Sequence, residues 1–521
     1  MRRIIVCLTG VLLLTFGFSL SGHAQEANNP LLYSYQAVQF SDRGIAQDPV
    51  TLVMPGTALG TGFGSYQDNP ASAAFFDESF GTFGLAFRSA SEENTFLGNT
   101  LNSSDNQTSI SNAGFVYNFP VTRGRLLIGA GYSQHSFYNR ALELSGTNNA
   151  TTITDQFKIP GSTYSDIAFN TYAIDFGDEI GDWDESIFRI GFDRLGDYLG
   201  IDQEAEILQR GFAGEYSAFL ATEFQRNLMV GLSLGIQAGR HTYDRVFLEV
   251  DRDNLYDGTV IDSNEDEVPD TDMDSVLLSE EIRNNYLSFQ ARAGMIYRVN
   301  SHLNVGASYT FPTRLTVDEI YDSRISTTFD NGEGFEDDLA GEYSYEVQSP
   351  ARVNIGFAFV DIGGISASFS AGYTDFSKTR VEFGEDEFEA ERDENQFISD
   401  QYKEVWDVRG GISMDLTDQF TLRAGYGYQP SRFKNMDLSK SRFSAGAGFA
   451  LTENTRLEVG AQYSLWKEES VVYNYGVYDY SALPDLEEGE GHLLPVSIHP
   501  EVADRDVGRL QILATLRIRL Y

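Results

Sequence analysis

The chain has 521 residues, with 77 Asp and Glu against 37 Lys and Arg, and a formal net charge of −40. So acidic a chain argues against nucleic acid as a partner, because phosphate backbones are bound by clustered Lys and Arg. A length of 521 suggests several soluble domains, but one large barrel also accounts for it without domain breaks.

The first 24 residues have the pattern of a secretory signal peptide. Arg2 and Arg3 precede an apolar run over 4–20, and a small-residue stretch over 21–24 follows. We expect cleavage after Ala24; the alternative, an uncleaved membrane helix, has a short apolar run and no stop-transfer flank. The only cysteine, Cys7, lies in this segment, so the mature protein is expected to have neither a disulfide nor a cysteine metal site.

Residues 25–79 precede the first expected strand and are too many for a simple lead-in. They are rich in small residues, notably Gly56, Gly60, Gly62, Gly64 and the run Asp68-Asn69-Pro70-Ala71-Ser72-Ala73-Ala74. Glycine permits tight turns and close backbone contact, so this segment is predicted to fold compactly inside a confined lumen. The alternative is a disordered periplasmic tail.

From Phe80 onward, fourteen stretches carry apolar residues at every second position. In one of them, Leu422 and Ala424 share a face, while Thr421, Arg423 and Gly425 share the other. This alternation is typical of strands between lipid and a polar interior, since a charged side chain at mid-bilayer costs about 2–4 kcal/mol. The expected strands are 80–89, 110–119, 125–139, 212–224, 228–249, 284–298, 302–318, 342–360, 364–383, 402–415, 419–431, 441–451, 454–474 and 508–521.

The links between these stretches alternate between short and long. Short ones such as 225–227, 416–418 and 452–453 are rich in turn-forming residues and predict periplasmic turns, whereas long ones, up to 140–209, predict external loops. The even count places both chain ends in the periplasm. The sequence therefore predicts an all-β fold, a 14-stranded antiparallel transmembrane β-barrel over 80–521. A soluble β-sandwich is the alternative, but it does not explain the alternating links.

Three groups of loop residues have two interpretations each. The apolar residues between Trp183 and Leu208 form either a ligand-binding groove or a lid that packs on itself. Side chains with oxygen ligands at alternate positions resemble a calcium loop, although the glycine of an EF-hand is missing and a solvated acidic loop is the default; they are Asp262, Asn264, Asp266, Asp270, Asp272 and Asp274. A tyrosine set is more typical of an interface girdle than of a ligand-capture site; it comprises Tyr473, Tyr475, Tyr478 and Tyr480.

The sequence predicts no enzyme, and we assign no catalytic, cofactor-binding or metal-binding residue. His135 directly precedes Ser136, so on a regular strand their side chains are expected to point to opposite faces. The last residue, Tyr521, resembles the aromatic terminus read by the barrel-assembly machinery. It is out of phase with the apolar face of its strand and has the same parity as Arg517 and Arg519, which stand where the assembly signal has apolar residues, so we expect either a bulge or an atypical signal.

An N-terminal plug that ends in Asn69-Pro70-Ala71 and precedes fourteen strands resembles the FadL/TodX family of outer-membrane transport proteins. Weaker matches lie at 349–358, 373–377 and 422–428. In that family a plug, or hatch, blocks the lumen, and its movement opens a lateral route through the wall. The resemblance implies a hatch over 25–79, with Asn69, Pro70 and Ala71 as the motif residues, although Ser72-Ala73-Ala74 departs slightly from the usual continuation.

The resemblance implies passive, hatch-gated uptake of hydrophobic small molecules, such as long-chain fatty acids, across the outer membrane of a Gram-negative-type bacterium. The implied partners are the hydrophobic ligand, outer-membrane lipids and lipopolysaccharide, and the barrel-assembly machinery during biogenesis. An apolar ligand needs a desolvated path, which a water-filled pore does not supply. Two alternatives remain: an outer-membrane component of a protein secretion system that binds cargo proteins, and a general porin.

Overall fold

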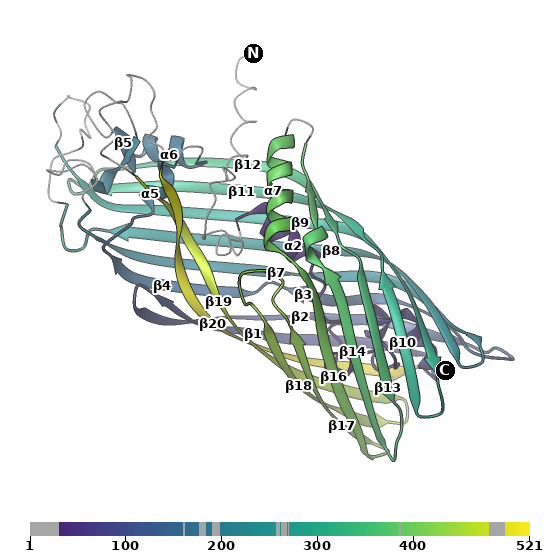
Figure 1. Cartoon of the computed structure of the whole chain (residues 1–521). Coiled ribbons are helices and arrows are strands. Elements are labelled where there is room, and N and C mark those ends of the chain that lie inside the picture. Colours follow the sequence, from purple (N-terminus) through teal and green to yellow (C-terminus); the bar gives the residue numbers. More distant parts are fainter. Residues whose placement is uncertain are drawn as a thin grey trace.

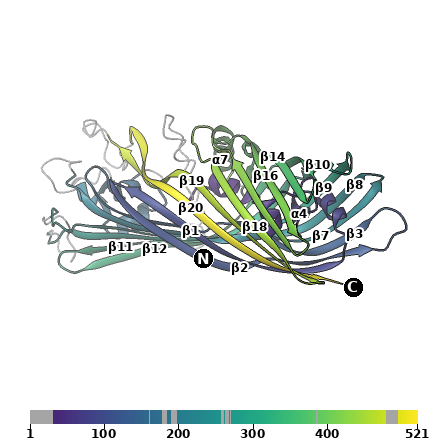
Figure 2. The same ribbon diagram turned by 90° about the horizontal axis from the view of Figure 1, so that it is seen from below.

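The computed structural model describes residues 31–159, 162–176, 184–189, 198–256, 261, 268, 270–384, 387–478 and 495–520. Eighteen strands form one antiparallel sheet that closes on itself, because the last strand pairs with the first from Phe80↔Arg519 to Thr95↔Asp504 (Figure 1). Figure 2 shows this seam from below.

Four positions in the wall consist of two strands in line, so the barrel has fourteen wall positions, as the sequence predicts. In order around the wall these are β1 (Phe80–Phe96), β2 (Asn99–Phe119), β3 (Leu126–Phe137) with β4 (Arg140–Asn148), β7 (Ile201–Gln225), β8 (Leu228–Val250), β9 (Met273–Arg298), β10 (Leu303–Thr310) with β11 (Thr313–Phe329), β13 (Arg352–Phe359) with β12 (Gly334–Ser349), β14 (Ile365–Asp375) with β15 (Arg380–Glu382), β16 (Glu404–Thr417), β17 (Phe420–Gln429), β18 (Lys440–Thr452), β19 (Thr455–Val477) and β20 (Ser497–Arg519).

The two faces of the wall differ as the alternation predicts. On β8, Leu232 and Leu234 are more than half exposed on the outside, while Ser233 and Gln237 are buried on the inside. Outward apolar and inward polar side chains repeat on the neighbouring strands, which gives the apolar outer band of a membrane barrel.

Two of the predicted long external links are wrong, because strands continue through them. β1 and β2 are joined by Leu97 and Gly98 alone, both with positive φ, as a two-residue hairpin turn requires. β11 and β12 are likewise joined by residues 330–333 only. Above the lipid, both faces of these strands meet water or protein. The apolar alternation therefore ends there, although the hydrogen-bonded ladder between the strands continues.

The outer rim is uneven. β7, β8 and β9 have 25, 23 and 26 residues, whereas β16, β17 and β18 have 14, 10 and 13. Above the short strands lie helix α7 (Phe388–Gln401) and the link 430–439, joined by an isolated bridge between Tyr402 and Phe433. This part of the mouth is therefore closed by loops where the wall is low.

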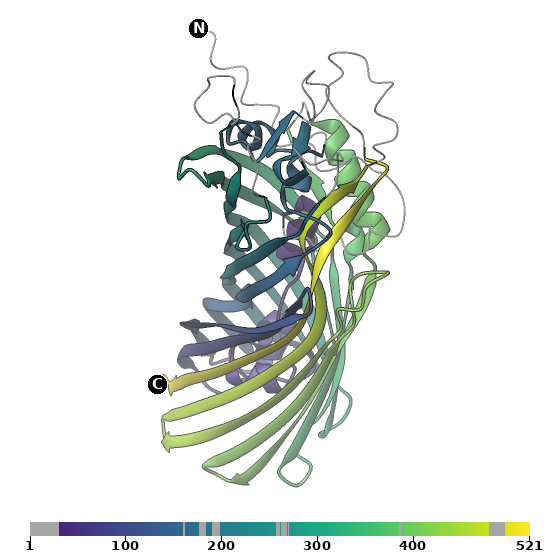
Figure 3. The same ribbon diagram turned by 90° about the vertical axis from the view of Figure 1, so that its left-hand side faces the viewer.

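Residues 31–79 lie inside the barrel, as Figure 3 shows for the purple segment within the ring of strands. This segment contains α2 (Tyr33–Ser41), α3 (Pro49–Val53), α4 (Ser65–Asp68) and the 3-10 helix η1 (Pro70–Phe75). None of the helices that the structure describes is both long and apolar enough to cross a bilayer.

The final strand contains no bulge as far as Arg519, since its register with β1 runs without a shift. Arg517 lies over the ring of Phe80 at 3.8 Å, and Arg519 pairs with Glu78 at 3.1 Å. Both arginines thus contact the start of the barrel, which accounts for charge at these positions; Tyr521 lies outside the described residues.

Candidate ligand site and its closures

The predicted motif residues join the plug to the wall. Asn69 Nδ2 donates to the carbonyl oxygen of Thr57 at 2.7 Å within the plug, and to those of Met295 (3.1 Å) and Ala307 (3.3 Å) on the wall. Asn69 Oδ1 accepts from the Ala71 backbone N–H at 3.0 Å and so caps η1, whose first residue is Pro70. One side chain therefore anchors β9 and β10 to the plug.

Five pairs of glycines line the lumen where the plug touches the wall. In each pair the two glycines are direct partners on neighbouring strands; the pairs are Gly114/Gly131, Gly231/Gly294, Gly306/Gly356, Gly411/Gly425 and Gly446/Gly460. A Cβ on Gly294 would lie 1.9 Å from Asn69 Oδ1, and one on Gly411 would lie 2.3 Å from the Val53 carbonyl oxygen. This glycine belt lets residues 49–71 rest directly on the strands.

Ion-paired side chains of the wall also contact the plug. Asp68 pairs with Arg409 of β16 at 2.7 Å and accepts from the Gly56 N–H at 2.8 Å. Arg352 of β13 pairs with Asp407 at 2.5 Å, and its other Nη donates to the Arg43 carbonyl oxygen at 3.0 Å. Arg352, Asn354 and Gly356, from the weaker sequence match at 349–358, therefore all face the plug.

A cavity of about 140 Å³ lies between residues 42–47, which we name the strap, and the wall. Its lining is rich in cations and in aromatic rings; it includes Tyr35, Phe137, Tyr138, Arg140, Arg432, Lys440, Arg442, Trp466 and Arg509.

Three of these cations lack a carboxylate partner among the described residues. Lys440 lies over the ring of Trp466 at 4.4 Å, Arg442 donates to the side chain of Gln429, and Arg509 donates to the Asn139 carbonyl oxygen at 3.0 Å. By contrast, Arg432 pairs with Asp42 at 3.3 Å. Uncompensated charges in a confined site are costly, so this cavity is suited to an anion.

The cavity reaches a part of the wall where β2 is not paired with β4, beside the break between β3 and β4. β2 pairs with β3 only as far as Asn112↔Ser133; beyond that point β2 pairs with β1 alone, and β4 pairs with β7. Over residues 99–111, β2 therefore has no ladder with the wall position formed by β3 and β4, and side chains bridge the space. Asn139 Nδ2, for instance, donates to Asp105 Oδ2 at 2.5 Å.

The expectation for His135 and Ser136 is wrong. A β-bulge between Gln134 and Ser136 breaks the strict alternation, so His135 Nδ1 and Ser136 Oγ lie 3.0 Å apart. Within the described part of the chain, no group hydrogen-bonds the other ring nitrogen, Nε2. Among the described residues, no carboxylate therefore orients this ring as in a catalytic triad.

Above the plug, the connection between β4 and β7 fills the barrel mouth. Its described elements are α5 (Thr154–Phe157), α6 (Ser165–Asn170), β5 (Ile174–Phe176), β6 (Asp184–Ser186) and η2 (Ile187–Arg189). Phe157, Ile174 and Phe188 are fully buried or nearly so in one cluster with strand residues such as Phe247 and Val472. From the apolar set between Trp183 and Leu208, this cluster contains Ile187, Phe188, Ile201 and Ile207, which pack as a lid; Trp183, Ile190, Phe192 and Leu195 lie outside the described residues.

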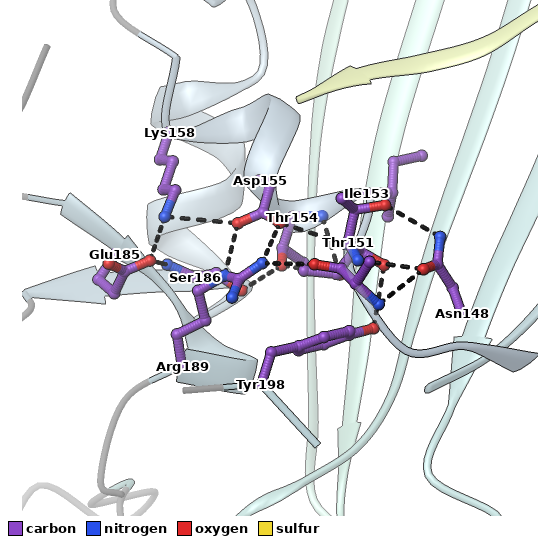
Figure 4. A network of polar contacts seen from close by, with 12 residues as sticks. Asn148, Thr151, Ile153, Thr154, Asp155, Lys158, Glu185, Ser186, Arg189 and Tyr198 are labelled. Atoms are coloured by element: carbon purple, nitrogen blue, oxygen red, sulfur yellow. Dashed lines mark hydrogen bonds and ion pairs between the residues drawn. The ribbon is translucent and has the colours of Figure 1, made fainter. Parts of the chain in front are cut away.

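Figure 4 shows the polar network that holds the lid together. Arg189 makes two hydrogen bonds to Asp155, at 2.9 and 2.7 Å, and Lys158 pairs with both Asp155 and Glu185. Burial raises the pKa of Asp155, but Lys158 and Arg189 together outweigh it and hold that pKa below its usual value. Glu249 of β8 joins the lid to the wall by accepting from the Ile153 N–H at 2.8 Å.

The girdle expected from the tyrosine set is wrong for Tyr473. Its ring is buried in the lid cluster, and its hydroxyl contacts Asn148, Thr151 and Gln203. The reason is that β19 continues beyond the lipid, so a tyrosine near its outer end meets the lid. Tyr480 lies outside the described residues.

Comparison with known proteins identifies the family. A sequence model of the family described as "Outer membrane protein transport protein (OMPP1/FadL/TodX)" matches residues 219–499. The chain belongs to this family. It is therefore an outer-membrane barrel of a family of channels for hydrophobic compounds, as the resemblance in the sequence implies. No curated protein matches the chain.

Several solved structures of this family are similar over most of their length. A Pseudomonas aeruginosa FadL homologue is 12% identical, with a TM-score of 0.49 over 91% of this chain and 99% of that one. The Pseudomonas putida toluene transporter TodX is 12% identical (TM-score 0.47, 92% and 99% covered). The Ralstonia pickettii toluene transporter TbuX is 14% identical (TM-score 0.44, 91% and 98% covered).

The family resemblance led to Asn69, Pro70 and Ala71 but not to the cavity or the glycine belt. The cavity is missed because its cations come from a loop and three distant strands, which only barrel closure brings together. The glycine belt is visible in the sequence, because its glycines all lie on the polar faces of alternating strands. An alignment of neighbouring strands in register would have shown that these glycines are paired.

The calcium hypothesis falls largely outside the described residues, which omit Asp262, Asn264 and Asp266. Among the residues that are described, no group of three or more His, Cys, Asp or Glu side chains is placed to hold a metal ion. The Asp274 carbonyl oxygen instead accepts from the Asp251 N–H at 2.8 Å, which continues the β8–β9 hairpin.

Proposed function

We propose that this protein is a hatch-gated outer-membrane channel for the passive uptake of hydrophobic molecules with an anionic head group. Long-chain fatty acids are the class that fits best. The observation that carries this proposal is the cavity beside the strap, where Lys440, Arg442 and Arg509 have no carboxylate partner within the part of the chain that the structure describes. A carboxylate bound there satisfies charges that are otherwise costly to confine.

Aromatic side chains provide the apolar part of the same site. Phe137, Tyr138 and Trp466 line the cavity together with Tyr35 of α2. An alkyl chain placed along these rings is removed from water, at about 25 cal/mol for each Å² of apolar surface. The interruption between β2 and β4 lies at Tyr138 and Asn139, close to Ile110, where the alternating apolar part of β2 ends, so a tail directed there reaches the outer edge of the apolar band.

The strap is the moving part of the proposed hatch. Residues 49–71 rest on the glycine belt and are fixed by Asn69 and Asp68, whereas the strap borders the cavity along one side. We propose that ligand entry and release require displacement of the strap and α2, while residues 49–71 stay in place. Hatch-gated passage, cleavage after Ala24, and contacts with lipopolysaccharide and the assembly machinery are parts of this proposal.

The closed mouth and filled lumen favour transport over the two alternatives. A general porin needs a water-filled lumen, and the secretion role would be favoured by an open-topped barrel. Here the lid occupies the mouth and the plug crosses the lumen. Both features are suited to a channel that admits a ligand in steps and excludes water.

Binding of oleate and of uncharged oleyl alcohol to the purified protein tests the head-group preference. In Lys440→Gln and Arg509→Gln we expect oleate affinity to fall roughly 10- to 100-fold, the effect of losing one charge-assisted hydrogen bond of about 1.5–3 kcal/mol. Affinity for oleyl alcohol should change far less. The control is Lys467→Gln, because Lys467 is exposed and pairs with Asp506 on the outer surface. Equal losses for both ligands, or none, would contradict the proposal.

A further inference from the structure

A second, smaller cavity of about 30 Å³ lies on the other side of the strap. Gly44 and His135 line both cavities, so the strap separates them at this contact. The other side chains that matter here are Arg43 from the strap, Gln67 from the plug, and Arg292 and Arg352 from the wall. The volume suits one species of the size of a water molecule or a monatomic ion.

The charges around this cavity do not balance. Arg292 makes a two-pronged pair with Glu215, at 2.7 and 2.5 Å, and Arg352 pairs with Asp407. Asp68, the carboxylate that lines the cavity, pairs with Arg409. Among the residues described, Arg43 has no such partner, and both of its terminal nitrogens are buried without a hydrogen bond. One positive charge is thus left over at this point.

The unsatisfied groups that line the cavity are hydrogen-bond donors. Besides both Nη atoms of Arg43, Gln67 Nε2 is buried without a partner, whereas no buried side-chain oxygen of the lining residues lacks one. The Ser136 hydroxyl has two acceptors within reach, His135 Nδ1 at 3.0 Å and the Asp42 carbonyl oxygen at 3.3 Å. In the tautomer in which it donates to Nδ1, the ring proton sits on Nε2 and His135 supplies a further donor. A water molecule would accept at most two of these bonds and leave the charge uncompensated.

We propose that a single monatomic anion of chloride size binds in this cavity, between Arg43, Gln67 and His135, and holds the strap against the wall. The anion neutralises Arg43 and accepts the N–H groups that the protein leaves free. Because Arg43 belongs to the strap and Arg292 and Arg352 to the wall, the ion joins the two. The site is separate from the cavity proposed for the ligand head group, so it does not depend on the proposed function.

Hydrogen exchange of residues 42–47 tests the proposal in the purified, full-length protein. Chloride is titrated against gluconate at constant ionic strength, since gluconate is too large for the cavity. Wild type should show saturable protection, about tenfold slower exchange when chloride is at ten times its dissociation constant, because the bound state gains a factor of one plus that ratio. Arg43→Met should lose this dependence, and Lys440→Met, in the other cavity, should keep it.

A crystal grown in bromide supplies a measurement that does not depend on how the variants fold. We expect an anomalous scattering peak beside Arg43 and Gln67 in wild type. Water alone in the cavity, absence of a chloride effect on wild type, or an unchanged effect in Arg43→Met would each overturn the proposal. Failure of oleate binding with the chloride effect intact would count against the proposed function instead.

Discussion

Ser103 Oγ on β2 donates a hydrogen bond to the carbonyl oxygen of Ala141 on β4 at 2.7 Å, across a part of the wall where the two strands share no ladder. Close by, Asp105 accepts from Asn139 Nδ2 at 2.5 Å and pairs with Arg210 at 3.0 Å. The wall is therefore closed by side chains at the point nearest the cavity. Side-chain contacts break singly, whereas a strand ladder opens only by losing many bonds together.

Asp105→Ala should open this closure. The substitution removes the bonds to Asn139 and Arg210, and we expect the closed state to lose about 1.5–3 kcal/mol, since bonds to a charged group are involved. Release of bound oleate into lipid vesicles should accelerate by roughly one to two orders of magnitude. Asp318→Ala is the matched control, because Asp318 accepts from Ser344 on an exposed strand face far along the wall. Equal release rates in the two variants would show that the contact at Asp105 does not limit exit.

Gly411 and Gly410 are neighbours on β16 and test the belt. A Cβ on Gly411 would lie 2.3 Å from the Val53 carbonyl oxygen, whereas one on Gly410 would meet nothing closer than 3.7 Å. Gly411→Ala should therefore displace α3 and expose residues 49–57 to hydrogen exchange at least tenfold faster, an increase worth about 1.4 kcal/mol. Gly410→Ala should resemble wild type. If the two variants behave alike, the plug does not rest on the strand at this position.

The barrel itself was predictable because lipid imposes a rule on every spanning strand. All fourteen wall positions follow from apolar alternation, and the plug motif at Asn69 follows from family resemblance. The rule ends where the lipid ends. The outer part of β2 is polar apart from Leu101, and the outer part of β11 has a polar outward face beyond Ile320, while Ile325 and Phe329 of its inner face pack in the lid cluster. The alternation rule therefore predicts loops there, and it places Tyr473 at the interface for the same reason.

The candidate site was not predictable in the same way. Lys440 and Arg509 are 69 positions apart in the chain, and neither differs locally from other lumen-facing cations. What sets them apart is that no carboxylate among the described residues pairs with them, which is visible only once the barrel is closed. The bulge at Gln134 likewise has no signal in a sequence that alternates, yet it brings His135 and Ser136 together.

Arg189→Ala should loosen the lid. The change removes both hydrogen bonds to Asp155 and the cation that lies 4.8 Å from the ring of Tyr198. Breaking a buried pair costs about 3–5 kcal/mol, so limited proteolysis between β4 and β7 should become much faster. Arg283→Ala is the control, since Arg283 pairs with Glu281 on the exposed surface, where such a pair is worth about 0–1 kcal/mol. A lid equally resistant in both variants would mean that its apolar cluster suffices.

The contact between α7 and α2 should depend on pH through Glu394. This carboxylate is buried, accepts from the Ser34 N–H at 2.9 Å, and has its pKa raised by that burial to about 7, although the hydrogen bond opposes the shift. Below pH 4.5 the docked and undocked states both hold the proton, and above 7 both have lost it. Between these values only the docked state keeps it, so docking weakens as pH rises from about 4.5 to about 7, by on the order of 3 kcal/mol.

Hydrogen exchange of residues 33–47 and 388–401 at pH 5.5 and pH 8, corrected for intrinsic rates, measures this dependence. Wild type should be better protected at pH 5.5, and Glu394→Gln should remove the difference over residues 388–401 because an amide stays neutral at both values. Over residues 33–47 it should reduce the difference, since Tyr33 also donates to the buried carboxylate of Glu319 at 3.1 Å. Glu389→Gln, an exposed position on the same helix, should leave the difference unchanged. If residues 388–401 keep the pH difference in Glu394→Gln, another titratable group is responsible for the pH dependence. A difference that vanishes there ties the position of α2, next to the strap, to the protonation of a single carboxylate on an outer helix.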